Sequence, residues 1–207
     1  PAAGCCAEVD GDVAVARRHP EPREALFELA VRRRRRVTRG LERDRATARK
    51  WPRPRGQWVA VVVDVGANMG WYTKFLSDLV GSSGTVVSVE PVPGTVRILR
   101  HVVATLRLAN VRIVPCAVSD GVGTVTMEIP RFADGERNIF EARIVGGEST
   151  GAETVRVETT TLDALTASLR GPVALVKVDV EGHELPALAG ATRLLRQTRP
   201  AWLIEVW

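Results

Sequence analysis

The chain has 207 residues, 45% hydrophobic and 26% charged, which indicates one globular domain with a buried core and not a disordered chain. The net charge of +5 is uneven, because residues 1–57 carry 15 Lys and Arg against 8 Asp and Glu, whereas residues 58–207 carry 14 against 16. No stretch approaches the roughly 20 apolar residues of a membrane span, and three cysteines form no zinc or disulfide pattern, so we expect a cytoplasmic protein.

The N-terminal part of the chain has the composition of an extension. Residues 1–22 contain few large apolar groups and predict a loose leader. Residues 23–50 favour a helix, and "WPRPRG" at 51–56 ends it and forms a linker. We therefore divide the chain into an Arg-rich extension at 1–56 and a domain at 57–207.

Five consecutive arginines occupy positions 32–36 of the predicted helix. Such a run binds phosphate on RNA or a membrane surface, or it forms a solvated helical face whose aliphatic stems lie over the domain. No aromatic residues are interleaved with the arginines, and this favours the solvated face.

From residue 57 the pattern alternates between buried strands and amphipathic helices. An apolar run bounded by glycine predicts a buried strand at 59–65, and valine-rich segments predict two more at 84–90 and 111–114. Apolar residues at helical spacing follow the first run from Trp71 and the second from Val96. The resulting β-α-β-α-β order predicts an α/β, Rossmann-like fold with a parallel sheet and right-handed crossovers.

The second half of the domain continues with shorter elements. "AVSDGVGTVTME" predicts a hairpin around Gly121 and Gly123, and residues 131–153 have no clear period and are a candidate flap. The remaining expected elements are a strand at "TVRVETTTL", a short helix at 162–169, a buried strand at "VALVKVDVEG", a helix carrying Leu185, Leu188 and Leu195, and a strand at "AWLIEVW".

Carboxylates follow three of the predicted strands. Asp64 and Glu90 come after the first two, and Asp179 and Glu181 come after the later one. Ligands of an open parallel sheet bind outside the carboxyl ends of its strands, near the point where strand order reverses. We therefore expect these acids to form a ligand site.

The motif that follows the first strand indicates which ligand. Gly66 and Gly70 permit a tight turn and a close approach of backbone to ligand, and Glu90 stands where an acid that binds ribose hydroxyls is expected. A dinucleotide site has G-x-G-x-x-G, but here the order is D-x-G-x-N-x-G. An acid ahead of the glycines repels pyrophosphate and suits an ammonium group, as in S-adenosylmethionine. A methyltransferase is the favoured interpretation, with a nucleotide oxidoreductase and a non-catalytic Rossmann-like module as alternatives.

Five blocks, in order and spacing, carry a family resemblance: "VVVDVGANMGWYT", "VVSVEPVPG", "NVRIVPCAVSDGVGTVTM", "TTTLDAL" and "LVKVDVEGHELPALAGA". Over about residues 57–207 they resemble the FkbM family of S-adenosylmethionine-dependent methyltransferases. The resemblance implies a class I methyltransferase fold: a mostly parallel central sheet, helices on both faces and a β-hairpin insertion after the third strand. It most often implies O-methylation of a sugar, glycan or natural-product hydroxyl. The family usually continues past "IEVW", so we expect a sheet truncated at its C-terminal edge.

The resemblance also assigns residues to the cofactor. Those under its methionine part would be Asp64, Gly66, Ala67, Asn68 and Gly70. Glu90 would hold the ribose hydroxyls, and Pro91 to Pro93 would lie beside the adenine. Ala117, Val118 and Asp120 would border the adenine from the far side.

The "KVDVEGHE" block would bring Lys177, Asp179, Glu181 and His183 to the reacting methyl. His183 is the natural base because histidine titrates near neutrality. Asp179 or Glu181 could orient it, act as the base instead, or hold a divalent ion, although no clear metal motif is present. Lys177 is either a salt-bridge partner of one of these acids or a functional group.

The expected partner is a small-molecule or glycan acceptor and not nucleic acid. Two alternatives stay open: an RNA methyltransferase that uses the arginines at 32–36 to hold phosphate, and a non-catalytic binding module or fragment.

Overall fold

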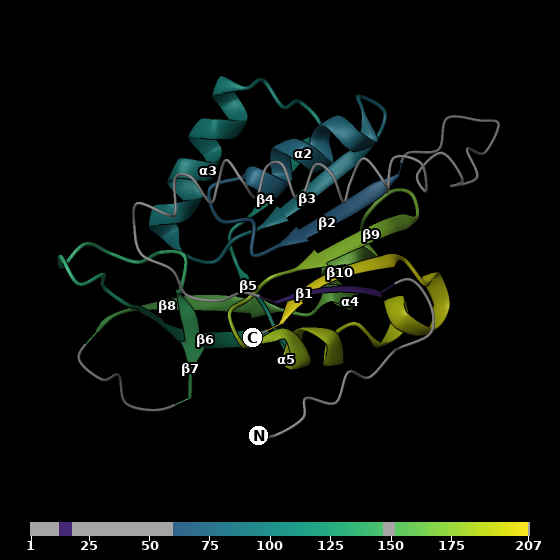
Figure 1. Cartoon of the computed structure of the whole chain (residues 1–207). Helices are drawn as coiled ribbons and strands as arrows, with labels where there is room; N and C mark the ends of the chain where they lie inside the picture. Colours follow the sequence, from purple (N-terminus) through teal and green to yellow (C-terminus); the bar gives the residue numbers. More distant parts are fainter. Residues whose placement is uncertain (1–12, 18–59, 147–151, 207) are drawn as a thin grey trace. The chain divides into compact units, whose positions relative to one another are not determined.

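A computed structural model describes residues 13–17, 60–146 and 152–206, and a six-stranded sheet lies at its centre (Figure 1). All of its strands are parallel. Their order is β1 (Val13–Arg17), β10 (Ala201–Val206), β9 (Val173–Val178), β2 (Val61–Val65), β3 (Thr85–Val89) and β4 (Val111–Val114). The chain runs outward from β2 to β4 and then returns to β9, so the strand order reverses between β2 and β9. The predicted α/β fold with a mostly parallel sheet is confirmed.

Strand β2 shows why these residues form a central strand. All five of its residues are buried. Val61, Val63 and Val65 belong to one core cluster and Val62 to another, as the two-residue period of a strand requires when both faces are covered. β-Branched valines suit this pleated, doubly buried surface.

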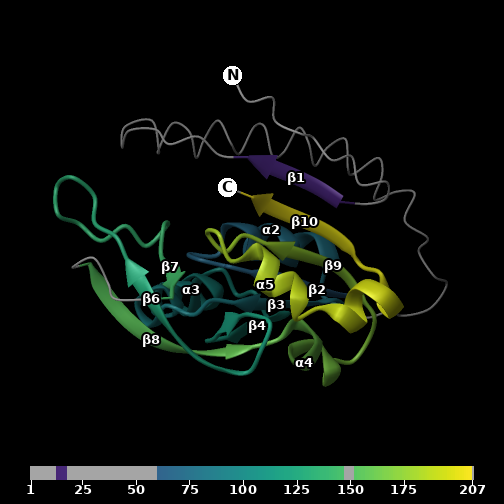
Figure 2. The same cartoon turned by 90° about the horizontal axis from the view of Figure 1, so that it is seen from below.

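Helices cover both faces of the sheet (Figures 1 and 2). On one face lie α2 (Trp71–Val80) and α3 (Pro93–Thr105); on the other lie α4 (Leu162–Ala167) and α5 (Glu184–Ala189). Leu76 of α2 packs with Val62, whereas Leu162 of α4 packs in the cluster of Val61. Among the described residues, no helix is both long enough and apolar enough to cross a bilayer.

A second, four-stranded sheet follows β4. Its order is β5 (Ala117–Val118), β8 (Glu153–Thr160), β6 (Gly123–Ile129) and β7 (Arg143–Val145). The sequence predicts an antiparallel insertion here, and β6 does pair antiparallel with β7 and β8. However, β5 is not the other arm of a hairpin with β6, because it pairs parallel with β8. The candidate flap is also not wholly irregular, since it contains β7.

Two further elements differ from the sequence-based expectation. The expected loose leader contains strand β1, which pairs in parallel with β10. The strand β10 is therefore not at the edge of the sheet. The helix expected to carry Leu185, Leu188 and Leu195 is divided into α5 and a π-helix, η1 (Leu194–Thr198). Gly190 ends α5 where an added Cβ would lie 2.2 Å from Ser119 O. The helix predicted at 23–50, with its arginine run, and the linker at 51–56 lie outside the described residues.

The glycines of the first motif are required by packing within the chain. Gly66 has a φ of +73°, and a Cβ there would lie 1.8 Å from the backbone O of Asp179. Gly70 caps α2 with a φ of +94°, and a Cβ there would lie 2.8 Å from Leu99 Cδ1. The tight turn is therefore present as predicted, but it is the loop after β9 and helix α3 that come close to these glycines.

We expect Gly66→Ala to lower the free energy of unfolding by roughly 3 kcal/mol or more, because the methyl group meets a backbone oxygen in addition to the left-handed φ. Gly81→Ala is the matched control, since Gly81 has a φ of +69° but no atom within 4 Å of an added Cβ. It should lose only about 1 kcal/mol. Urea denaturation measures both values, and equal losses would contradict the packing explanation.

Candidate functional site

A buried lysine joins the loops that follow β2 and β9. Lys177 Nζ lies 3.5 Å from Asp64 Oδ1 and 3.3 Å from Asp179 Oδ2. It also donates a hydrogen bond of 3.0 Å to the backbone O of Gly66. The strand register causes this arrangement, because Lys177 on β9 is the direct neighbour of Asp64 on β2. The predicted salt bridge between Lys177 and Asp179 is therefore present, and Asp64 is a second partner.

The environment of Lys177 keeps its ammonium group charged. Burial alone would lower its pKa, since only 2% of the residue is exposed, but the nearby carboxylates of Asp64 and Asp179 outweigh burial and the pKa is raised above its ordinary value. The ring of Tyr72 also lies 4.9 Å from Nζ in a cation–π contact.

Asp64 is fully buried, and its two carboxylate oxygens differ: Oδ1 has no hydrogen-bond partner among the described residues and lies 3.5 Å from Lys177 Nζ. Its Oδ2 accepts a 2.7 Å hydrogen bond from the hydroxyl of Thr73 at the start of α2. The sequence analysis matched this carboxylate to an ammonium group of a ligand, whereas here the ammonium group nearest to it is that of Lys177. Asp64 therefore links β2 to the start of α2 and to Lys177 on β9.

Glu90, which follows β3, accepts a hydrogen bond from the loop at residues 66–70, here called the motif loop. Its Oε2 accepts from the backbone N–H of Asn68 at 3.0 Å, and its Oε1 accepts from that of Val92 at 2.9 Å. Burial is the main cause that raises the pKa of Glu90 to about 7; the two N–H groups and Lys177 only partly oppose it.

Asn68 connects this carboxylate to the flap. It adopts a left-handed φ of 48°, which asparagine tolerates better than most residues. Its Oδ1 accepts from the N–H of Met69 at 2.8 Å, and its Nδ2 donates to the backbone O of Ile139 at 3.4 Å. The motif loop thus contacts both Glu90 and the segment 131–146.

Ser119 links two predicted site residues that are distant in sequence. Its hydroxyl donates to Asp120 Oδ1 at 3.0 Å and lies 2.9 Å from His183 Nε2. The sequence analysis placed Asp120 at the adenine side and His183 at the methyl, but the structure joins them through a single hydroxyl. Ser119, which is 6% exposed, was missed as a partner. Its presence in the "AVSD" block was the available signal, yet only the fold brings it to His183.

The hydrogen bonds of Ser119 determine the tautomer of His183. A hydroxyl has one proton, and Ser119 gives it to a carboxylate that can only accept. His183 must therefore carry its proton on Nε2 and donate it to Ser119, which leaves Nδ1 with the basic lone pair. Partial burial lowers the pKa of His183 despite the nearby Asp120 and Glu184, so the ring is neutral at neutral pH.

The turn after β9 has an unusual backbone. Glu181 has a φ of 52° and Gly182 a φ of 91°. Glu184 Oε1 accepts from the N–H of Gly182 at 3.0 Å and stabilises this turn at the start of α5. A left-handed conformation at a non-glycine residue is typical of sites where the fold aims a side chain for function.

The predicted divalent-ion ligands do not assemble into a donor set. Within residues 13–17, 60–146 and 152–206, no three His, Cys, Asp or Glu side chains gather in a way that suits a metal ion. Asp179, one of the two expected ligands, has its Oδ2 beside Lys177.

Other predicted cofactor residues form the frame of the site. The N–H groups of Gly66 and Ala67 both donate to Val89 O at 3.0 Å. Ala117 and Val118 are buried in two different core clusters and present almost no surface. Pro91 lines a groove described below.

The fold and the site together define a Rossmann-like ligand-binding domain. Its parallel sheet reverses strand order between β2 and β9, and a D-x-G-x-N-x-G turn and several carboxylates meet there. A family model described as "Methyltransferase FkbM domain" matches residues 64–206. The chain belongs to the FkbM methyltransferase family.

Two solved structures are similar to the chain. Methyltransferase FkbM from Methylobacillus flagellatus KT is 18% identical with a TM-score of 0.49, and the match covers 70% of this chain and 32% of that one. A SAM dependent methyltransferase from Aquifex aeolicus is 29% identical with a TM-score of 0.28, and the match covers 31% of this chain and 35% of that one. Each match thus spans about a third of the solved chain. None of the curated proteins matches the sequence.

The raised pKa of Glu90 predicts a pH dependence of stability. Its folded pKa of about 7 lies above the ordinary 4.5, so its contribution to stability is fully present below pH 4.5 and is lost as pH rises through about 7. Relative to Glu90→Gln, the wild type should lose roughly 3 kcal/mol of unfolding free energy between pH 4.5 and 8. Denaturant titrations of both proteins at several pH values measure this difference. A difference that does not change with pH would contradict a pKa of Glu90 that burial raises.

Proposed function

We propose that this chain binds S-adenosylmethionine and transfers its methyl group to a hydroxyl of a small-molecule or glycan acceptor. The observation that supports this best is the Glu90 carboxylate, buried at the end of β3 and oriented by the N–H groups of Asn68 and Val92 in a chain of the FkbM methyltransferase family.

Glu90 fits a ribose. A carboxylate has about four acceptor positions, and each oxygen of Glu90 uses one of them for a backbone N–H. Each oxygen can therefore accept one further hydrogen bond, which matches the two adjacent hydroxyl donors of a ribose. The same two donors would favour the charged form of a carboxylate that burial disfavours.

Asp64 supports the same site from a fully buried position. Through Thr73 and Lys177 it fixes the start of α2 and the backbone at Gly66. S-adenosylmethionine supplies a methyl group already activated by its sulfonium. The protein therefore has to orient the acceptor oxygen, exclude water and remove the hydroxyl proton.

His183 is the base we propose for that proton. Its ring is neutral, Ser119 holds Nε2–H, and Nδ1 retains its lone pair. Asp179, one alternative, forms an ion pair with Lys177 through its Oδ2. This ion pair stabilises the charged carboxylate and makes it a weaker base. Glu181 stays the alternative base, since it lies two residues before His183 in the turn after β9.

Calorimetric titration with S-adenosylmethionine tests the proposal without knowledge of the acceptor. The wild type should bind, and Glu90→Ala should weaken binding by about 100-fold or more, since two charge-assisted hydrogen bonds are lost. His183→Ala should leave the affinity within about threefold, because a base acts on the acceptor.

Two outcomes of this titration count against the proposal. No heat from a demonstrably folded wild type would exclude a cofactor-binding enzyme. A loss of affinity in His183→Ala as large as in Glu90→Ala would place His183 with Asp120 at the adenine side, and its role as base would then be wrong.

A further inference from the structure

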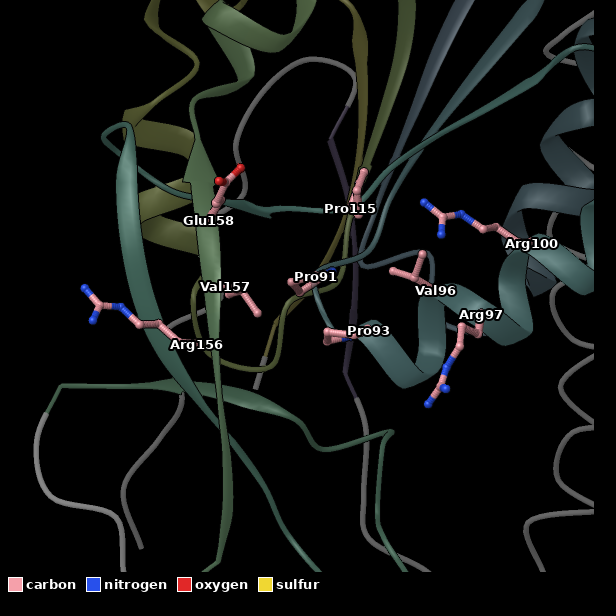
Figure 3. Close-up of a pocket in the computed structure, with 9 residues that line it drawn as sticks. All are labelled: Pro91, Pro93, Val96, Arg97, Arg100, Pro115, Arg156, Val157 and Glu158. Atoms are coloured by element: carbon pink, nitrogen blue, oxygen red, sulfur yellow. The ribbon is translucent and has the colours of Figure 1, made fainter.

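A groove of about 590 Å³ lies between α3 and β8 (Figure 3). This volume is typical of small-molecule sites. Pro91 and Pro93, which the family resemblance places beside the adenine, are among the residues that line the groove. The groove also has lining residues on α3 and β8 that have no role in the proposed methyl transfer, so it extends beyond the site formed by Glu90, Asn68 and the Lys177 bridge.

The walls of the groove are positively charged. Arg97 and Arg100 lie one helical turn apart on α3, and Figure 3 shows both side chains extending from the helix on the side of the groove. Arg156 and Glu158 on β8 also line it. Three arginines and one glutamate give the lining a formal charge of +2.

The arginines of α3 are not neutralised by neighbours. The helix Pro93–Thr105 contains no acidic residue. Throughout the described ranges, neither Arg97 nor Arg100 forms an ion pair or a hydrogen bond through its side chain. Arg156, in contrast, donates to Thr124 Oγ1 at 3.0 Å. Two guanidinium groups thus stay available to an anion.

The other residues that line the groove are apolar, and three of them are prolines: Pro91, Pro93, Val96, Pro115 and Val157. In Figure 3 the side chains of Val96 and Val157 extend from opposite sides of the groove. Proline rings have fixed φ and few rotamers, so a planar or ring-shaped group can pack on them at small entropic cost.

We propose that this groove binds a phosphate monoester of a small molecule. The phosphate carries a charge close to −2 at neutral pH, equal and opposite to the lining. Arg97 and Arg100 hold its oxygens by charge-assisted hydrogen bonds, for which the guanidinium fork is suited. The organic part of the ester packs on the prolines and valines.

The test uses the full chain and phenyl phosphate as probe, with binding followed by calorimetry. The wild type should bind phenyl phosphate and not phenol, which has the same ring without the phosphate. The double variant Arg97→Gln/Arg100→Gln should bind about tenfold more weakly or worse, because two charged donors are lost. Glu158→Gln should bind more tightly, since a like charge is removed from the wall.

Arg170→Gln/Arg196→Gln is the matched control. Both arginines are exposed and lie outside the groove, and the loss of net charge is the same. Its affinity should stay within about twofold of the wild type, as expected when local contacts decide binding. An equal loss of phenyl phosphate affinity in both double variants would show that the net charge of the protein, and not contact with Arg97 and Arg100, determines binding. This result would overturn the proposal.

Two further results would also overturn it. One is the absence of phenyl phosphate binding by the folded wild type. The other is loss of phenyl phosphate binding in the presence of saturating S-adenosylmethionine, which would show that the groove belongs to the cofactor. Because the probe needs no methyl transfer, failure here leaves the proposed function untouched, and failure of the proposed function leaves this test valid.

Discussion

The ligand site depends on one buried ammonium group between two carboxylates. Lys177 stands beside Asp64 in the sheet and beside Asp179 at the end of its own strand. A buried ion cluster of this kind is weak support for stability compared with apolar packing, but removing one member leaves charges without compensation. Its value lies in specificity: it joins the carboxyl ends of β2 and β9, where strand order reverses. Gly66 is confined at the same point, since its O accepts from Lys177 and its Cα faces Asp179 O.

Hydrogen bonds connect the other residues of the candidate site to the loops that Lys177 joins. The turn that begins at Gly66 delivers the N–H of Asn68 to Glu90, and the side chain of Asn68 reaches the flap at Ile139. On the other side, the turn after β9 delivers His183 to Ser119. In our proposal Glu90 is the acid that meets the cofactor, whereas the contacts of Asp64 are with Thr73 and Lys177 of the protein itself.

The sequence predicts the elements of this fold well because they are local. The valine-rich run at 59–65 and the leucines at helical spacing indicate a strand and a helix within a few residues of sequence, and the family blocks placed the acids at the strand ends. What the sequence could not supply are contacts set by register and topology. The pairing of Lys177 with two acids requires β9 beside β2 in one particular register, and the Ser119–His183 contact joins residues 64 positions apart. The parallel pairing of β5 with β8 and the strand at Val13–Arg17 depend on distant partners in the same way.

A double-mutant cycle between Asp64 and Lys177 tests this account most directly. Asp64→Asn, Lys177→Met and the double variant are compared with the wild type by denaturant unfolding at neutral pH. If the buried bridge holds the two loops together, each single variant is strongly destabilised, and the double variant recovers part of the loss. We expect a coupling free energy of about 2 kcal/mol. Additive losses, with a coupling near zero, would contradict the account.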